Sequence, residues 1–199
     1  MARPKAQEQQ RKNLVQAAMD AVSARGLSGL RLKDIAEYAG LSIGSVSYYY
    51  PEIDDLLIEA HHEATERFYW NRMEHVAQCD SAIEAIQVAV REGIPDGPVT
   101  ADVHMLYELH TFAGRSAAHA ELMTQLWERE VSLYQDIIER GIAAQDFLTL
   151  HSSRAIAETA VALEDAFNLH MVSSNNSVTS QLGRERLLAY LNDVLGIAE

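Results

Sequence analysis

Apolar residues recur every three or four positions through most of the chain, which is the spacing of one face of an α-helix. The first such set comprises Leu14, Ala17, Ala18, Ala21 and Val22. It predicts a helix over about residues 7–24, and Gly26 follows where a left-handed helix cap is expected. Valine, isoleucine and threonine alternate with polar residues over no long stretch. The pattern therefore predicts an all-α protein.

Capping and turn residues divide the rest of the chain into further helices. Pro51 ends one of them, because the residue before a proline avoids the helical backbone conformation. The segment 93–98 holds two glycines and two prolines and is the clearest loop. The expected helices cover about residues 33–39, 43–50, 54–76, 82–91, 100–113, 117–141, 153–172 and 181–195. With the first helix, this makes about nine.

Residues 32–50 form two short helical patterns separated by a tight turn, which predicts a helix-turn-helix. Ala36 supplies the small residue needed where the two helices cross, and Gly40 allows the chain to reverse direction. The apolar residues expected to lock the crossing angle are Ile35, Leu41, Val46 and Tyr50.

The second of these helices carries a small, polar outward face. On a helical wheel, Gly44 and Tyr48 fall opposite the inward-facing Val46, and Ser45 and Ser47 flank them. Serine hydroxyls can bond base edges or phosphates, and Tyr48 and its neighbour Tyr49 can bond phosphate or pack on a thymine methyl. The alternative is an ordinary helical hairpin with half-buried tyrosines.

The charge distribution favours contact with nucleic acid at one end of the chain. The formal net charge is −13, but residues 1–50 carry +3 and the other 149 residues carry −16. A basic end on an acidic body is expected where one end meets phosphate. A solvated N-terminal tail would give the same pattern.

Several function classes receive no support from the sequence. Cys79 is the single cysteine, and no Cys/His pair has the spacing of a zinc site. The first residues lack the apolar stretch of a secretory signal, and no apolar run reaches the roughly 18 residues of a membrane span. We therefore expect a cytoplasmic protein that needs no cofactor or metal and has no membrane partner.

The N-terminal region resembles the TetR family of transcriptional regulators. The resemblance covers about 50 residues, and the remainder agrees only in length and helix count. It rests on the interval from Ala18 to Gly26 and on the motifs IAEYAGLSIGSV over residues 35–46, YYYP over 48–51 and DDLL over 54–57. It implies a three-helix DNA-binding domain over residues 1–52 and a helical ligand-binding and dimerisation domain over residues 53–199. The residues expected to contact DNA are Lys5, Arg11, Lys12, Arg31, Lys33, Ser42, Ile43, Gly44, Ser45, Ser47, Tyr48 and Tyr49.

Three positions depart from the family pattern. Arg31 stands where a capping Ser or Thr is common, which removes a cap worth about 1 kcal/mol but offers a phosphate contact. Ser47 stands where Tyr is common, so one contact to DNA is expected to be weaker. Glu52 and Ile53 stand where a lysine–phosphate contact is usual, and Glu52 would repel DNA. Four basic residues near the N-terminus are expected to compensate by reaching phosphate or, from the N-terminal arm, the minor groove: Arg3, Lys5, Arg11 and Lys12.

The resemblance further implies a small-molecule pocket enclosed by the fourth to seventh helices and a dimer formed by the last two. The last two helices are rich in alanine and leucine, which permits close packing of four helices across a two-fold axis; an intramolecular hairpin core is the alternative. Polar residues on mostly apolar helices are the pocket candidates. They are Phe68, Asn71, His104, Glu108, Trp127, Asp165 and Asn168. If Trp127, Glu108 and Asp165 converge, a cationic or amine ligand would fit.

The leading hypothesis is a repressor that binds a palindromic duplex operator as a homodimer and is released by a small-molecule effector. An all-α enzyme is the rival, but the sequence holds no Ser/His/Asp spacing, phosphate-binding glycine loop or HExxH motif, and we expect no catalytic residues. His104 with Glu108 is the closest approach to a catalytic pair. A protein-binding adaptor is the third hypothesis.

Overall fold

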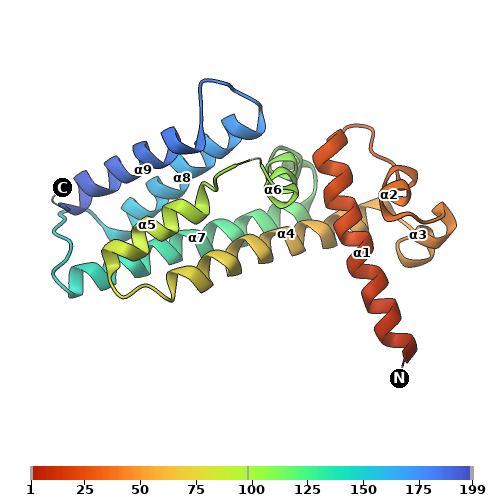
Figure 1. Cartoon of the computed structure of the whole chain (residues 1–199), viewed down its shortest axis with the longest axis horizontal. Helices are drawn as coiled ribbons and strands as arrows, with labels where there is room; N and C mark the ends of the chain where they lie inside the picture. The colour runs from red at the N-terminus through yellow and green to blue at the C-terminus, as the bar shows by residue number, and fades with distance from the viewer. Residues whose placement is uncertain (1, 98, 198–199) are drawn as a thin grey trace. The chain divides into compact units, whose positions relative to one another are not determined.

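The computed structural model describes residues 2–97 and 99–197, without the side chains of residues 2–4. This part of the chain is helical, as predicted, and contains no strand. The helices are α1 (Ala2–Arg25), α2 (Leu32–Ala39), α3 (Ile43–Tyr49), α4 (Ile53–Val76), α5 (Ala82–Gly93), α6 (Ala101–Phe112), the 3-10 helix η1 (Ala113–Arg115), α7 (Ala117–Ala143), α8 (Ser153–Val172) and α9 (Ser180–Leu195) (Figure 1). None of the described helices is both long and apolar enough to span a lipid bilayer.

Several predicted helix ends that a cap or turn residue marks are correct. Gly26 has a left-handed backbone with φ of +70° directly after α1. The Thr100 hydroxyl accepts a hydrogen bond from the Val103 amide at the start of α6, and Ser152 is the N-cap residue of α8. The start predicted for α1 is wrong, because the helix begins at Ala2. Pro4 falls in its first turn, where the missing amide hydrogen has no helical partner to lose.

The chain divides into two compact units. The first comprises Met1–Arg67 and Thr100–Met123, and so holds α1 to α3, most of α4, α6, η1 and the start of α7. In this unit α1 packs against both α2 and α6. Its core side chains include Leu14, Met19, Ile35, Val46 and Leu56, all fully buried. The core therefore joins the predicted helix-turn-helix to the long first helix.

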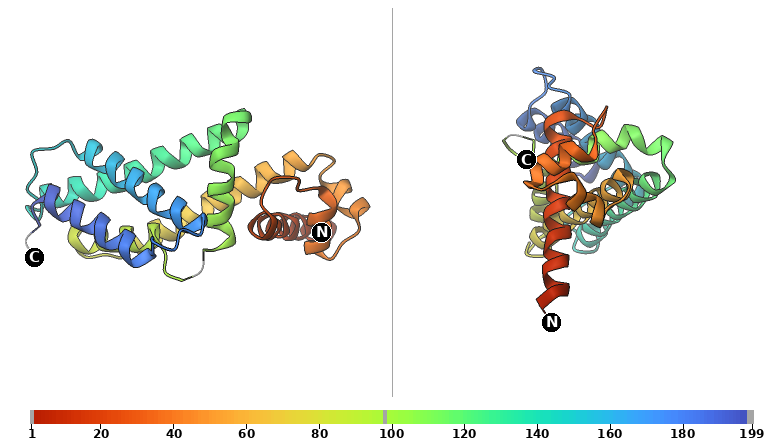
Figure 2. Two further views of the ribbon diagram at one scale, coloured as in Figure 1. Left: turned by 90° about the horizontal axis from the view of Figure 1, so that it is seen from above. Right: turned by 90° about the vertical axis from the view of Figure 1, so that its right-hand side faces the viewer.

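The second unit comprises Phe68–Val99 and Thr124–Glu199. Its helices are the end of α4, α5, most of α7, α8 and α9. α8 and α9 lie side by side, and α5 packs against α9 (Figure 2). One apolar cluster holds these helices together, with Ile86, Tyr134, Ile138, Val161 and Leu191 almost fully buried within it. The predicted division into functional domains at residues 52 and 53 stays a prediction.

Candidate nucleic-acid interface

The turn between α2 and α3 is made by Gly40 and Leu41. Gly40 has φ of +65°, a backbone conformation that favours glycine. The Leu41 amide then donates to the Ala36 carbonyl at 2.9 Å and closes the end of α2. This geometry produces the abrupt change of direction that the sequence predicts.

Side-chain hydrogen bonds fix the starts of both helices. The Ser42 Oγ accepts from the Ser45 amide at 3.1 Å and lies 2.8 Å from the Ser45 Oγ. At the start of α2, the Asp34 carboxylate accepts from the Arg31 amide at 2.9 Å. Asp34 thus stabilises a helix end at which Arg31 replaces the usual capping hydroxyl.

The two faces of α3 differ as the helical wheel predicts. Val46 and the following Tyr50 are buried against the rest of the unit, at 0% and 2% exposure. On the opposite face, Tyr48 is 73% exposed. Ile43 begins the helix on the same side as Tyr50 and is nevertheless 52% exposed. The remaining candidates are exposed at Ser42, Gly44 and Ser45 and half-buried at Ser47 and Tyr49. No other described part of the first unit therefore covers the outward face of α3, which is open to a large partner.

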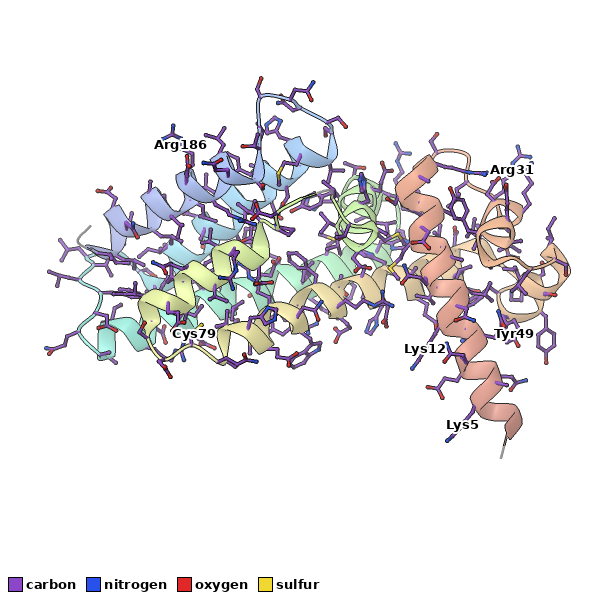
Figure 3. All side chains as sticks on the ribbon, in the orientation of Figure 1. Lys5, Lys12, Arg31, Tyr49, Cys79 and Arg186 are labelled. Atoms are coloured by element: carbon purple, nitrogen blue, oxygen red, sulfur yellow. The ribbon has the colours of Figure 1, made fainter. Side chains whose placement is uncertain are left out.

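Most of the candidate basic side chains are exposed. Lys5 and Lys12 project away from α1, and Arg31 lies directly before α2 (Figure 3). Lys12 forms an exposed ion pair with Glu8 at 3.5 Å, one helical turn away. Within the part of the chain that the structure describes, Lys5, Arg31 and Lys33 form no ion pair. The side chain of Arg3 lies outside the described residues.

Arg11 differs from the other candidates because it is engaged within the protein. Its guanidinium hydrogen-bonds the Glu59 carboxylate and lies 4.5 Å from the centre of the Tyr50 ring. The hydrogen bond with Glu59 raises the pKa of Arg11 above its ordinary value, against the opposing effect of burial. Arg11 therefore links α1 to α4 beside the end of α3.

Sequence reasoning did not identify Arg25, which neutralises the acidic residues of α2. Its guanidinium pairs with Asp34 at 2.7 Å and with Glu37 at 2.9 Å, and it lies 5.5 Å from the centre of the Tyr38 ring. The acids of the helix-turn-helix thus have a cationic partner, which lowers their repulsion of a phosphate backbone. These ion pairs could have been predicted from the sequence, because Asp34 and Glu37 share one face of a helix and Arg25 stands just before the turn residue Gly26.

The candidate pocket residues are distributed over both units. In the first unit His104 and Glu108 are half-buried, and Glu108 accepts a hydrogen bond from the Leu27 amide at 3.3 Å. In the second unit Phe68, Trp127 and Asp165 are half-buried, Asn71 is exposed and Asn168 is buried. The predicted convergence of Trp127, Glu108 and Asp165 stays a prediction.

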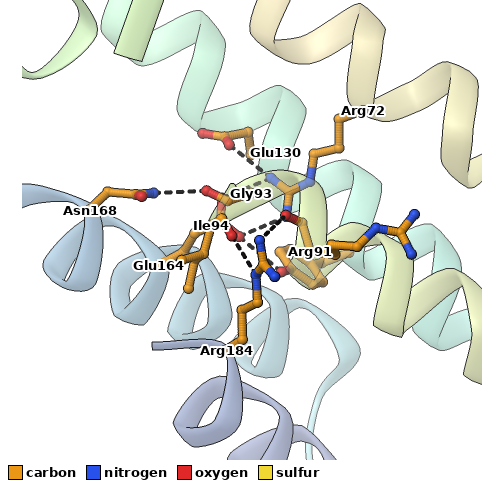
Figure 4. A network of polar contacts seen from close by, with 9 residues as sticks. Arg72, Arg91, Gly93, Ile94, Glu130, Glu164, Asn168 and Arg184 are labelled. Atoms are coloured by element: carbon orange, nitrogen blue, oxygen red, sulfur yellow. Dashed lines mark hydrogen bonds and ion pairs between the residues drawn. The ribbon is translucent and has the colours of Figure 1, made fainter. Parts of the chain in front are cut away.

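Asn168 lies beside a buried network of charges in the second unit (Figure 4). The Arg72 guanidinium bonds both oxygens of Glu164, at 2.9 and 2.7 Å, and one oxygen of Glu130 at 3.0 Å. The Tyr134 hydroxyl donates to Glu164 at 2.9 Å, and the Asn168 amide donates to the Gly93 carbonyl at 2.8 Å. One guanidinium thus faces two carboxyl groups.

Burial, followed by the charge of Glu164, raises the pKa of Glu130 well above its ordinary value. Burial also raises the pKa of Glu164, against the opposing effect of Arg72. A proton on Glu130 would leave one charge of each sign in the buried network, which agrees with the direction in which its pKa is shifted. No residue of this network had been singled out except Asn168.

A pair of buried histidines occupies the core of the first unit. The Nδ1 atoms of His61 and His119 are 3.0 Å apart, and both side chains are at most 2% exposed. Among the described residues, no group of three or more His, Cys, Asp or Glu is arranged to hold a metal ion.

A family model described as "Bacterial regulatory proteins, tetR family" matches residues 14–60, which include the second half of α1, all of α2 and α3, and the start of α4. Among curated proteins, the comparison finds no match to this sequence.

Solved structures with the same fold cover nearly the whole chain. A TetR transcription regulator from Haloarcula marismortui has 21% identity and a TM-score of 0.83, over 94% of this chain and 99% of its own. A TetR-family regulator from Rhodococcus has 24% identity and a TM-score of 0.77, with the same coverage. A transcriptional regulator from Saccharomonospora viridis in complex with choline has 18% identity and a TM-score of 0.85, over 93% and 96%. Residues 14–60 thus match the TetR family of bacterial regulatory proteins, and the chain shares the fold of solved TetR-family regulators.

Proposed function

We propose that this protein represses transcription by binding a palindromic operator as a homodimer, and that a small-molecule effector releases it from DNA. One observation carries the proposal: the outward face of α3 is open, with Tyr48 at its centre and 73% exposed. Its small neighbours Gly44 and Ser45 allow close approach to base edges. Lys5, Lys12, Arg31 and Lys33 supply charge for the phosphates that flank a major groove.

Operator binding is tested by fluorescence anisotropy with a labelled duplex from the region flanking the protein's own gene. Tyr48→Ala is expected to weaken binding about tenfold, because a base contact contributes about 1 to 3 kcal/mol. Trp70→Ala is the matched control, since it removes an exposed aromatic ring from the second unit. The operator affinity of Trp70→Ala is expected to equal that of the wild type.

The phosphate contact is tested separately through the salt dependence of binding. Lys12→Ala is expected to reduce the slope of log K against log salt by about one unit. Arg186→Ala removes an exposed charge from α9 and is expected to leave the slope unchanged. Unchanged operator affinity in both Tyr48→Ala and Lys12→Ala would refute DNA binding by this surface and favour the enzyme or adaptor hypothesis.

The proposed dimer uses α8 and α9. α8 exposes a stripe of mostly small residues at intervals of three or four positions, which places them on one face. The stripe consists of Ala155, Thr159, Ala162, Ala166 and Leu169. Small side chains permit close helix contact across a two-fold axis. Ala162→Arg is expected to convert a dimer to a monomer in light scattering. Ser132→Arg, at an exposed position of α7, is expected to leave the dimer intact. A monomeric wild type would refute the dimer.

The proposed effector is a cation or amine bound in the second unit. Trp127 and Asp165 offer an aromatic ring and a carboxylate there, with Phe68, Asn71 and Asn168 as further candidates. The choline complex of the Saccharomonospora protein supports this ligand class. A thermal-shift panel containing choline tests it, and stabilisation only by anions or neutral lipids would contradict it.

A further inference from the structure

A cleft of about 460 Å³ lies within the first unit, between the connection from α1 to α2 and the end of α6. This volume is within the range of small-molecule sites, roughly 300 to 1,000 Å³. The residues that line the cleft are Leu27, Ser28, Gly29, Glu108, Thr111, Phe112 and Arg115. All of them belong to the unit that carries the helix-turn-helix.

The cleft combines one carboxylate, one guanidinium and one aromatic ring. Glu108 and Arg115 are seven residues apart, which separates their backbones by about 10 to 12 Å along α6 and η1. Among the described residues, they form no ion pair with each other, and Arg115 is exposed. Phe112 stands between them in the sequence and contributes apolar lining. Opposite charges are thus held apart across an apolar surface.

The loop side of the cleft leaves room for a bound molecule. Gly29 has φ of +78°, and a Cβ atom added there would meet nothing within 4 Å. On the same loop, the Leu27 amide donates to the Glu108 Oε2 at 3.3 Å, which is a long hydrogen bond. Glu108 is therefore held by a weak contact that a better donor can replace.

We propose that this cleft binds a small zwitterion of the ω-amino acid type. The ligand's ammonium pairs with the Glu108 carboxylate, its carboxylate pairs with the Arg115 guanidinium, and its methylene chain lies along Phe112. Charge-assisted hydrogen bonds at both ends make binding depend on the distance between the two ligand charges. The site shares no residue with the effector candidates of the second unit.

Binding at this cleft would also act on the helix-turn-helix, and this consequence rests on the proposed function. An ammonium bound to Glu108 competes with the Leu27 amide and loosens the loop between α1 and α2. Arg31 and the start of α2 follow that loop directly. We therefore expect the zwitterion to change operator affinity without entering the second unit.

Binding is measured by isothermal titration calorimetry of the full-length protein without DNA. The probes are 4-aminobutyrate, 5-aminopentanoate and 6-aminohexanoate, with hexylamine and hexanoate as single-charge controls. The longer amino acids are expected to bind best. Glu108→Gln and Arg115→Gln are each expected to weaken their binding at least tenfold. Glu74→Gln removes an exposed carboxylate from the second unit and is expected to have no effect.

Three outcomes would overturn the site: no ω-amino acid binds, hexylamine binds as tightly as 6-aminohexanoate, or neither cleft variant weakens binding. The regulatory consequence is measured by anisotropy of the labelled operator with and without 6-aminohexanoate. Binding of the probe with unchanged operator affinity would refute the coupling to the loop. A protein that binds the probe but no operator would refute the proposed function and leave the site intact.

Discussion

The first unit is expected to lose stability as the pH falls from 7.5 to 5, because its core holds two neutral histidines. The Nδ1 atoms of His61 and His119 are 3.0 Å apart, so one ring must donate and the other accept. Burial, helped by the nearby His119 and His62, lowers the pKa of His61 to about 3. Burial also lowers the pKa of His119, while the Asp54 carboxylate acts in the opposite direction.

The sign and size of the effect follow from proton binding. The pKa of His61 is about 3 in the folded protein and about 6.5 in the unfolded chain, so only the unfolded chain binds a proton between these values. The stabilisation by the neutral ring is present above pH 6.5 and is lost as the pH falls below it. At pH 5 the cost from His61 alone is about 2 kcal/mol, and at pH 7.5 it is close to zero.

The assay compares denaturant unfolding of the wild type and His61→Asn at pH 7.5, 6 and 5. An asparagine amide lies near the position of the lost Nδ1 and does not titrate, so it can still bond His119. The smaller side chain lowers stability at every pH. The expected signal is therefore the decrease in the free energy of unfolding between pH 7.5 and pH 5, which should be about 2 kcal/mol smaller in the variant.

His151→Asn is the matched control, because it removes an exposed imidazole from the loop before α8. Its unfolding profile is expected to follow that of the wild type. Parallel pH profiles for the wild type and His61→Asn would refute the argument that His61 is buried in neutral form.

Three further perturbations test the packing and charge of the two units. Because burial and Glu164 raise the pKa of Glu130, the folded protein keeps a proton that the unfolded chain releases above the ordinary pKa of about 4.5. The free energy of unfolding should therefore fall as the pH rises from that value toward the folded pKa, by at most about 1.4 kcal/mol per pH unit, and Glu130→Gln should remove this fall in denaturant unfolding. Gly93→Ala places a Cβ atom 2.3 Å from the Glu164 carboxyl group, so calorimetry should show a Tm lower by several degrees, whereas Gly114→Ala meets nothing within 4 Å and should not. Ser42→Ala removes the cap of α3 and should cost about 1 kcal/mol in denaturant unfolding and weaken operator binding in anisotropy. These arguments would be refuted by an unchanged pH profile in Glu130→Gln, an unchanged Tm in Gly93→Ala or an unchanged free energy of unfolding in Ser42→Ala.

Most helix ends could be predicted from the sequence because local residues determine them. Gly26, Gly40, Ser42 and Thr100 act on amides or carbonyls within a few positions, so no knowledge of packing is needed. The predicted end of α7 at Gly141 was wrong for the opposite reason. The Cα of Gly141 lies inside α7 against the Phe147 ring, where a Cβ would be 2.1 Å from a ring carbon, so close packing explains this glycine.

The outward face of α3 was equally predictable, because a seven-residue helix that buries Val46 and is followed directly by the buried Tyr50 has little choice of orientation. The engagement of Arg11 with Glu59 was not, since the two residues are 48 positions apart and join different helices. An arginine on the first helix of a DNA-binding unit is equally compatible with a phosphate contact and an internal one. Only tertiary structure separates these two roles.

The buried network of the second unit shows how a sequence can predict that a charged side chain is buried in the core. Arg72 and Glu164 are 92 positions apart, so no local pattern joins them. Glu164 nevertheless falls on the buried stripe of α8, four residues after Ala160 and four before Asn168. Asp165, the candidate chosen from the sequence, is one position off that stripe and only half-buried. A carboxylate on an apolar stripe must find a cation or lose its charge, so its partners should be sought on the helices that face the stripe.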